Sequence, residues 1–397
     1  MIKRQLKPSL LSAAQEYPIV AILGPRQSGK TTLALDTFPN YKYVSLEDPD
    51  TREYVTNDPR DFLEMNKNEE GLIIDEAQYV PTLFSYIQTM SDKQKKRGYF
   101  ILTGSQNFLL SEAITQSLAG RVSILTLLPL SISELKENNI LPSSVEEIMF
   151  QGMYPSIYSD EVLPKPKAAK WYHNYIRSYI EKDVRQIKNV TNLSDFRKFM
   201  QLCAARTGQL LNLTPISIEC GISVNTAKSW LSLLESSYII YLLQPYSKGF
   251  TKRVIKTPKL FFYDTGIVAS LLKLDTLDKI IYETTIKGNI FESLMISEVV
   301  KSSYNKDKDP NVYFWRDKTG HEIDCIIDQG TSLLPIEIKF GKTVRDEFFS
   351  QLNYWNQLTD SNPKDGYLVY GGLEHQIRSV GNVISWKDVD KIVLSYK

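Results

Sequence analysis

Three apolar runs in the first part of the chain, at residues 17–23, 71–74 and 99–102, each end in small or charged residues. Continuous apolar runs of this length predict strands that are buried on both faces, as in a parallel sheet. The first run leads through a glycine-rich loop into a helical pattern that starts at Leu33. A strand, a loop and a helix in succession are typical of a parallel α/β unit. We therefore expect residues 1–150 to form an α/β domain with helices on both faces of its sheet.

Residues 151–265 show a different pattern, in which apolar positions recur three and four residues apart. Residues 213–235 predict a helix, a turn at Gly221 and a second helix capped by Ser223. The strand and the basic hairpin that follow, up to Lys259, then predict the wing of a winged-helix domain.

A helix-turn-helix unit presents the start of its second helix to the major groove of DNA. The polar and basic residues at these positions favour DNA as a partner. Winged helices also dock other proteins, and the pattern leaves both partners open. The candidate DNA-binding residues are Asn225, Thr226, Lys228, Lys252, Arg253, Lys256 and Lys259.

The distribution of charge singles out this middle segment. The whole chain has 47 Lys and Arg residues against 46 Asp and Glu residues, and these totals disfavour a dedicated nucleic-acid binder. Residues 1–150 carry 15 basic and 19 acidic side chains (net −4), residues 151–260 carry 16 and 7 (net +9), and residues 261–397 carry 16 and 20 (net −4). The basic segment predicts either a phosphate-facing surface or a basic face that contacts another domain.

The glycine-rich loop after the first apolar run has the spacing G-x-x-x-x-G-K-T of a Walker A motif. Backbone N–H groups of such a loop and the N-terminus of the next helix bind phosphate oxygens. We expect Lys30 to bind the β- and γ-phosphates of ATP and the hydroxyl of Thr31 to bind Mg²⁺. The candidate nucleotide-binding residues are Gly24, Pro25, Arg26, Gln27, Ser28, Gly29, Lys30, Thr31 and Thr32.

The second apolar run ends in two adjacent carboxylates, Asp75 and Glu76, which is the pattern of a Walker B strand. We expect Asp75 to hold Mg²⁺ through water and Glu76 to act as the general base for the attacking water. A strand followed by a solvated acidic turn is the alternative. The presence of both motifs in order disfavours that alternative.

Two further catalytic candidates follow the third apolar run. This run ends near Ser105 and Gln106, where a P-loop ATPase with an inserted strand places a group that senses the γ-phosphate. Arg121 follows a glycine and is either an arginine finger or an arginine ion-paired at a helix end. A finger would act in cis or across a subunit interface, and the second case requires a homo-oligomer.

Residues 266–397 combine a helical stretch that contains Glu292 with apolar strands that carry Asp324, Glu337 and Lys339. Residues two apart in a strand share a face, so Glu337 and Lys339 project together, and Asp324 can join them from a paired strand. Carboxylates in this arrangement bind a Mg²⁺ that polarises a scissile phosphate, and the lysine stabilises developing charge. A hairpin with a Glu–Lys pair on its solvent face is the alternative.

Together these motifs resemble a prokaryotic AAA-type P-loop ATPase family whose members carry a C-terminal domain of unknown function related to restriction-type nucleases. The resemblance includes Leu118-Ala-Gly-Arg121, Gly152-Met-Tyr-Pro155, Phe262-Tyr-Asp264-Thr-Gly266 and Gly288-Asn-Ile-Phe-Glu292, so it spans nearly the whole chain. The ordered set from Glu292 to Lys339 is similar to the PD-(D/E)XK nucleases, and Gln351 matches an accessory position in many of them. Family members usually have arginine where this chain has Lys182, which keeps the charge but loses the planar fork.

Motifs and resemblance together predict a Mg²⁺-dependent ATPase that couples ATP turnover to rearrangement of a DNA-binding winged helix and a PD-(D/E)XK nuclease-like domain. The alternative is a nucleotide-switched DNA- or protein-binding protein whose nuclease-like domain is a non-cleaving scaffold. Three cysteines without paired spacing exclude a cysteine-built zinc site and fit a reducing compartment. The chain shows no signal-peptide pattern and no apolar run of about 20 residues, so we expect a cytoplasmic chain with no membrane partner.

Overall fold

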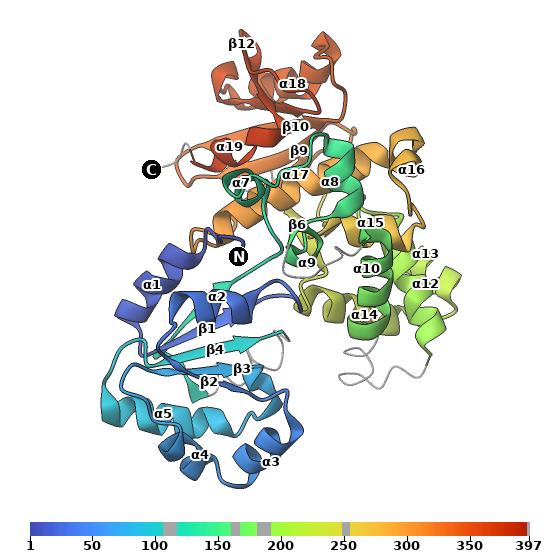
Figure 1. Cartoon of the computed structure of the whole chain (residues 1–397). Helices are drawn as coiled ribbons and strands as arrows, with labels where there is room; N and C mark the ends of the chain where they lie inside the picture. The colour runs from blue at the N-terminus through green and yellow to red at the C-terminus, as the bar shows by residue number, and fades with distance from the viewer. Residues whose placement is uncertain (106–116, 160–166, 181–191, 248–254, 395–397) are drawn as a thin grey trace.

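The structure of the protein is a computed structural model, and it describes residues 1–105, 117–159, 167–180, 192–247 and 255–394. Their helices and strands form an N-terminal α/β domain, a helical middle region and a C-terminal α/β domain (Figure 1). Within these ranges, no helix is both long and apolar enough to cross a membrane.

Five parallel strands form the sheet of the N-terminal domain, in the order β2-β3-β4-β1-β5. β4 lies between β1, which precedes the glycine-rich loop, and β3, which ends in the acidic pair. The inserted strand that the sequence predicts is therefore confirmed. The strands are β1 (Ile19–Leu23), β2 (Lys42–Ser45), β3 (Leu72–Asp75), β4 (Phe100–Gly104) and β5 (Val122–Thr126).

Helices cover both faces of this sheet, because successive side chains of each strand point to opposite sides. On β1, Val20 and Ile22 pack with α1 and α2, whereas Ala21 and Leu23 pack with α3, α4 and α5. Figure 1 shows the two groups of helices on opposite sides of the sheet. The helices are α1 (Lys7–Glu16), α2 (Lys30–Thr37), α3 (Pro49–Asn57), α4 (Pro59–Met65) and α5 (Leu83–Gln94). The predicted α/β arrangement is confirmed.

The middle region contains the predicted helix-turn-helix pair, formed by α13 and α14. Gly221 ends α13 with φ of +70°, a left-handed conformation that glycine adopts without strain. The hydroxyl of Ser223 then accepts a hydrogen bond from the N–H of Thr226 at the start of α14. The helices are α7 (Ile132–Glu137), α8 (Val145–Gln151), α9 (Pro155–Tyr158), α10 (Ala168–Tyr175), α12 (Leu193–Ala204), α13 (Leu213–Cys220) and α14 (Val224–Ser236), with a π-helical turn at Ile176–Ile180.

The C-terminal sheet has eight strands in the order β12-β13-β11-β10-β9-β8-β6-β7. α17 packs on one face against Ile336, and α18 packs on the other against Ile326. The strands are β6 (Ile240–Pro245), β7 (Lys259–Phe262), β8 (Val312–Arg316), β9 (Glu322–Asp328), β10 (Leu333–Lys339), β11 (Tyr367–Tyr370), β12 (Gln376–Arg378) and β13 (Gly381–Ser385). The helices are α15 (Thr265–Leu271), α16 (Leu277–Tyr282), α17 (Lys287–Tyr304), α18 (Ser350–Thr359) and α19 (Asp390–Leu394).

The strands β6 and β7, which the sequence assigns to the wing of the middle domain, belong to the C-terminal sheet. β6 pairs antiparallel with β7 and, at its end, parallel with β8 through Gln244 and Pro245. The C-terminal sheet therefore extends across the boundary expected after residue 265. Every residue of β7 is buried. A strand of this kind must be covered on both faces, which explains why β7 packs as part of the sheet.

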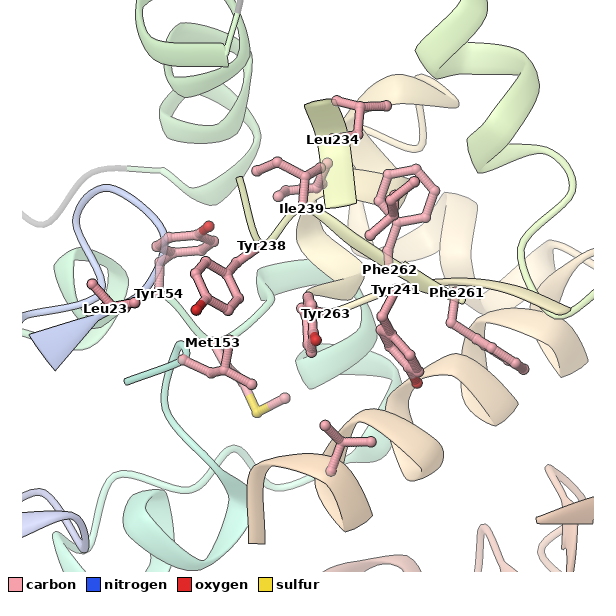
Figure 2. Close-up of a cluster of buried hydrophobic side chains, with 14 of the residues drawn as sticks. Leu23, Met153, Tyr154, Leu234, Tyr238, Ile239, Tyr241, Phe261, Phe262 and Tyr263 are labelled. Carbon is pink, nitrogen blue, oxygen red and sulfur yellow. The ribbon is translucent and has the colours of Figure 1, made fainter. Parts of the chain in front are cut away.

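One hydrophobic core connects the three regions. It includes Leu23 at the end of β1, Tyr154 after α8, and Tyr238 and Tyr263 beside the β6–β7 hairpin (Figure 2). The rings of Tyr238 and Tyr263 have their centroids 6.3 Å apart. The core is therefore continuous across the expected boundary at residue 150, so the N-terminal domain is packed against the rest of the chain.

Candidate functional site

The glycine-rich loop between β1 and α2 adopts backbone angles that an ordinary loop rarely combines. Gly24, Gln27 and Gly29 have φ of +152°, +60° and +94°. A Cβ added at Gly24 would lie 2.0 Å from the carbonyl oxygen of Leu127, so this position accepts only glycine. Positive φ angles in such a loop turn successive N–H groups toward one side, where they can bind an anion.

Lys30 begins α2 and its side chain lies over the loop. Its Nζ donates hydrogen bonds to the carbonyl oxygens of Gly24 and Pro25 at 3.0 and 2.8 Å. The side chain is buried, and its ammonium lies beside the backbone of the loop. The structure therefore places Lys30 at the glycine-rich loop, and its binding of phosphate stays a prediction.

Thr31 and Asp75 come together at the ends of α2 and β3. The hydroxyl of Thr31 donates to Asp75 Oδ1 at 2.7 Å, the hydroxyl of Tyr43 donates to Oδ2 at 3.1 Å, and Thr103 also donates to Oδ1. A hydroxyl and a carboxylate side by side fit Mg²⁺, which takes oxygen ligands and keeps positions for phosphates and water. Tyr43 and Thr103 were not expected, and they hold the carboxylate in place.

Glu76 is buried directly after Asp75, in a left-handed backbone conformation with φ of +53°. Its Oε2 accepts hydrogen bonds from the hydroxyl and the N–H of Ser105, at 2.8 and 3.3 Å, and from the side chain of Gln78. Burial raises the pKa of Glu76, but the charge of Lys30 and the hydrogen bonds outweigh burial and lower this pKa overall. The carboxylate is therefore ionised, as a general base requires. Gln106, the alternative γ-phosphate sensor, lies outside the described residues.

A cavity of about 470 Å³ lies against the loop, and it extends to parts of the chain that motif spacing does not indicate. Arg4 donates to the carbonyl oxygens of Ser28 and Leu128 at 2.6 and 2.7 Å, so it ties the N-terminal segment to the loop. The residues that line the cavity outside the Walker motifs include Met1, Ile2, Arg4, Asp36, Pro155, Ser156 and Ser159. The sequence pattern gave no signal for Arg4, whereas Pro155 ends one of the motifs on which the family resemblance rests.

The loop is also connected to α10 through its backbone. The hydroxyl of Tyr175 donates to the carbonyl oxygen of Arg26 at 3.1 Å, and it lies 3.0 Å from the hydroxyl of Tyr154. The side chain of Arg26 donates to the hydroxyl of Tyr79 at 2.9 Å and lies 3.6 Å from Glu47. Helical residues beyond the Walker motifs therefore contact the loop directly.

Arg121 does not lie near this cavity. It precedes β5, whose first residue Val122 pairs with Ile19 at the start of β1, and the glycine-rich loop follows the opposite end of β1. Its guanidinium pairs with Asp92 on α5, with Nε–Oδ1 and Nη2–Oδ2 distances of 2.6 and 3.0 Å. The expected finger in cis is therefore wrong, and the alternative of an ion-paired arginine fits. A role across a subunit interface stays a prediction.

The predicted acidic group of the C-terminal domain forms on β9 and β10. Lys339 Nζ lies 2.7 Å from Glu337 Oε2 and 3.1 Å from Asp324 Oδ2. The N–H of Ile338 donates to the same oxygen of Asp324 at 2.8 Å. Burial and the neighbouring Asp324 raise the pKa of Glu337 to about 8, although Lys339 lowers it. The alternative of a Glu–Lys pair on a solvent face is wrong for this pair, because Glu337 is buried.

Lys259 lies in this acidic group instead of at a DNA-binding surface. Its side chain is 3% exposed, its Nζ lies 2.9 Å from Glu292 Oε1, and it also pairs with Glu322. Glu292, Glu322 and Asp324 offer oxygen atoms that all lie within 4.8 Å of one another. The expectation that Lys259 contacts DNA is wrong, because a buried, paired ammonium does not reach a phosphate. Glu322 was missed, although its position two residues before Asp324 puts both on one strand face.

Gln351 on α18 lies beside the start of β9. Its side-chain oxygen accepts a hydrogen bond from the N–H of Glu322 at 3.3 Å, and it lies 3.3 Å from Nδ1 of His321. Gln351 therefore supports the strand that carries two of the carboxylates.

The remaining DNA-binding candidates differ in their accessibility. Asn225 and Lys228 are exposed at the start of α14, and Lys256 is exposed before β7. Thr226 is half-buried, and its hydroxyl lies 2.8 Å from that of Ser223. Lys252, Arg253 and the family position Lys182 lie outside the described residues.

Comparisons with protein families assign the three regions separately. Residues 16–136 match the family described as an AAA domain. Residues 142–278 and 287–389 match two families described as domains of unknown function, DUF8612 and DUF4143. The N-terminal domain is therefore an AAA-type P-loop ATPase domain.

Relatives that match along most of the chain are described as uncharacterized proteins. An uncharacterized protein of Mycobacterium tuberculosis is 25% identical over 350 residues, which cover 86% of this chain and 74% of the relative. An uncharacterized protein of Methanocaldococcus jannaschii is 24% identical over 341 residues, or 78% and 72% of the two chains.

A Walker-type ATPase of Pyrococcus abyssi is among the solved structures that align with part of this chain. It has a TM-score of 0.46 and 13% identity, and the match covers 68% of this chain and 96% of that one. The RuvB Holliday junction branch migration motor of Thermotoga maritima has a TM-score of 0.30 and 18% identity, over 59% and 88% of the chains.

Proposed function

We propose that the AAA-type P-loop domain binds ATP with Mg²⁺ and hydrolyses it, with Glu76 as the general base. The observation that carries this proposal is the buried, ionised carboxylate of Glu76, held by Ser105 and Gln78 beside the Walker loop. A carboxylate in this state can accept the proton of an attacking water.

Each neighbouring residue has a distinct role in this proposal. The loop N–H groups and Lys30 bind the phosphates, and Thr31 and Asp75 hold Mg²⁺, which neutralises phosphate charge when bound. Ser105 orients Glu76 through the hydrogen bond at 2.8 Å. Water is partly excluded, since Lys30, Asp75 and Glu76 are all buried. Burial strengthens the electrostatic interactions among them.

The nucleotide base fits the part of the cavity formed by the N-terminal segment and the segment after α8. Ile2 and Pro155 supply apolar surface there, and Asp36 and Ser159 supply polar atoms. Such a mixture suits a planar, polar-edged base. ATP would thereby bridge the α/β domain and the middle region.

The segment after α8, which lines the cavity, also contacts the C-terminal part of the chain. These contacts support coupling of ATP turnover to the rest of the chain. The N–H of Met153 donates to the buried Asp264 at 2.7 Å, and Asp264 caps α15 by accepting from the N–H of Gly266 at 3.0 Å. Asp264 directly follows the β6–β7 hairpin. If nucleotide binding shifts residues 153–155, Asp264 should shift with them. This movement would then change the positions of the helix-turn-helix region and of the C-terminal sheet.

The second candidate function is a nucleotide-switched binding protein with a non-cleaving C-terminal scaffold, the partner being DNA or a protein. The pairing of Lys259 with two of the C-terminal carboxylates favours this candidate over a nuclease. A winged helix for the middle region is supported by the order α12, α13, α14, β6, β7 and by the bridge between Leu210 and Lys259. The exposed Asn225 and Lys228 then form the candidate DNA-contacting end of α14.

The ATPase proposal is tested with Glu76→Gln in the full-length protein. We expect Mg²⁺-dependent phosphate release to fall by about 10²- to 10⁴-fold, because the amide accepts no proton. Binding of ATP, followed by calorimetry, is expected to persist. Glu53→Gln, an exposed glutamate on α3, is the matched control and should turn over ATP like the wild type. Wild-type turnover in Glu76→Gln would disprove the assigned base.

A further inference from the structure

The ammonium of Lys259 lies among the carboxylates that a PD-(D/E)XK-like arrangement would offer to a metal. It pairs with Glu292 at 2.9 Å and with Glu322, and the ring of Phe314 has its centroid 5.5 Å from Nζ. Burial lowers the pKa of Lys259, but Glu292, Glu322 and Asp324 raise it above its usual value. The side chain is therefore a permanent cation at this point of the fold.

The other charged groups of the cluster leave little negative charge to be neutralised. Arg316 Nη1 lies 2.9 Å from Glu322 Oε2, and Lys339 lies 3.1 Å from Asp324 Oδ2. With all four carboxylates ionised, the cluster of four carboxylates and three cations has a formal charge of −1, which a divalent ion would turn into +1. The raised pKa of Glu337 makes the cluster less negative still at neutral pH. The carboxylates are Glu292, Glu322, Asp324 and Glu337, and the cations are Lys259, Lys339 and Arg316.

The geometry of the cluster also disfavours a divalent metal ion. Mg²⁺ needs about six oxygen ligands at about 2.1 Å. The ammonium of Lys259 already lies within hydrogen-bonding distance of two of the three carboxylates, so both cations do not fit together. The backbone of Lys259 is fixed by pairing with Leu243 on β6 and by a bridge to Leu210. Residues 292, 322 and 324 therefore do not fit a metal while β7 is in place.

We propose that Lys259 is a built-in cation that takes the place of a divalent metal among Glu292, Glu322 and Asp324. The cluster is then a set of buried ion pairs that connects β7 to α17 and β9. It holds the end of the helix-turn-helix region to the C-terminal sheet without metal. This role is independent of ATP hydrolysis, so its failure and the failure of the ATPase proposal are distinguishable.

The first test compares metal binding of wild type and Lys259→Met, as nucleotide-free, full-length proteins. Mn²⁺ binding is measured by the loss of its free electron paramagnetic resonance signal. We expect Lys259→Met to bind Mn²⁺ at least about tenfold more tightly than the wild type. Adding Glu292→Gln should abolish the gain. Lys256→Met, which removes an exposed lysine three residues away, is the matched control and should bind like the wild type.

A second measurement does not depend on the folding of Lys259→Met. Wild type and Asp324→Asn are titrated with Mn²⁺, and the Walker site, present in both, contributes equally. We expect the two titrations to coincide, because Asp324 holds no metal in the wild type. Weaker Mn²⁺ binding by Asp324→Asn than by the wild type would overturn the proposal. Folded Lys259→Met without a gain in affinity would overturn it as well.

Discussion

Ser105 donates a hydrogen bond of 2.8 Å to the carboxylate of Glu76 across the neighbouring strands β3 and β4. The residue after the inserted strand is thereby connected to Glu76, the proposed general base, and its role as a phosphate sensor stays a prediction. The same carboxylate oxygen also accepts from the N–H of Ser105. A change in the position of β4 would therefore change the position of Glu76.

Ser105→Ala is expected to lower the turnover number for ATP by about tenfold, because Glu76 loses a group that orients it. ATP affinity should change little. The hydrogen bond lowers the pKa of Glu76, so its loss raises this pKa. The base works in its ionised form, and the acidic limb of the pH–rate profile should therefore move to higher pH. Ser85→Ala, at an exposed serine of α5, should leave the profile unchanged.

Arg121→Ala separates a structural arginine from a finger that acts across an interface. In dilute protein we expect turnover close to that of the wild type, because Arg121 pairs with Asp92 away from the loop. An arginine finger contributes about 10³- to 10⁵-fold to turnover, so the two outcomes are well separated. The measurement is phosphate release as a function of protein concentration. A strong loss that appears only at high concentration would indicate a finger donated by a second copy.

Charge reversal at two exposed lysines tests the contact with DNA. Lys228→Glu and Lys256→Glu are expected to weaken binding of duplex DNA. Each should also reduce the slope of log affinity against log salt by about one. Fluorescence anisotropy at several salt concentrations measures both quantities. Lys93→Glu, on the distant helix α5, controls for net charge. Unchanged affinity and slope would instead favour a protein partner.

The ion pairs of Asp388 predict that the free energy of unfolding depends on pH in the acidic range. It lies 2.5 Å from Lys136 on α7 and 2.9 Å from His375. Burial raises its pKa, but hydrogen bonds from Lys136, Lys391 and His375 outweigh burial and lower it far below the usual range. Because the pKa of Asp388 is lower in the folded state, its ionised form stabilises the fold at pH values above the unfolded-state pKa of about 3.9. This stabilisation is lost as the pH falls below that value toward the folded-state pKa.

Asp388→Asn should therefore lower the melting temperature at neutral pH. The difference from the wild type should shrink as the pH falls below about 4. Thermal unfolding at a series of pH values measures this difference. Asp365→Asn, at an exposed aspartate, is the control and should melt like the wild type throughout. A difference that persists at the lowest pH would contradict this account of Asp388.

Local patterns predicted the parts of the site that follow one another in sequence. The Walker loop and the acidic pair each depend on a strand and the residues immediately after it, so periodicity and glycine spacing were sufficient. Arg4 was beyond such reasoning, because its partners lie 24 and 124 residues away. No local pattern specifies that packing.

For Lys259, the local sequence pattern led to a wrong prediction. Its basic neighbours predicted an exposed hairpin, whereas its burial depends on Glu292, 33 residues further along the chain. Charge along a sequence therefore predicts where cations occur, and tertiary contacts decide which of them meet solvent. The basic excess of residues 151–260 includes one lysine that neutralises acidic residues inside the protein.

The parallel pairing of β6 with β8 has a consequence for how the chain unfolds. A fragment that ends after residue 265 would lack β8 and α17, so β6 would have an unpaired edge and the buried face of β7 would meet water. Such a fragment should aggregate or bind chaperones. We therefore expect the helix-turn-helix region and the C-terminal sheet to unfold as one cooperative unit, and a protease to release them together.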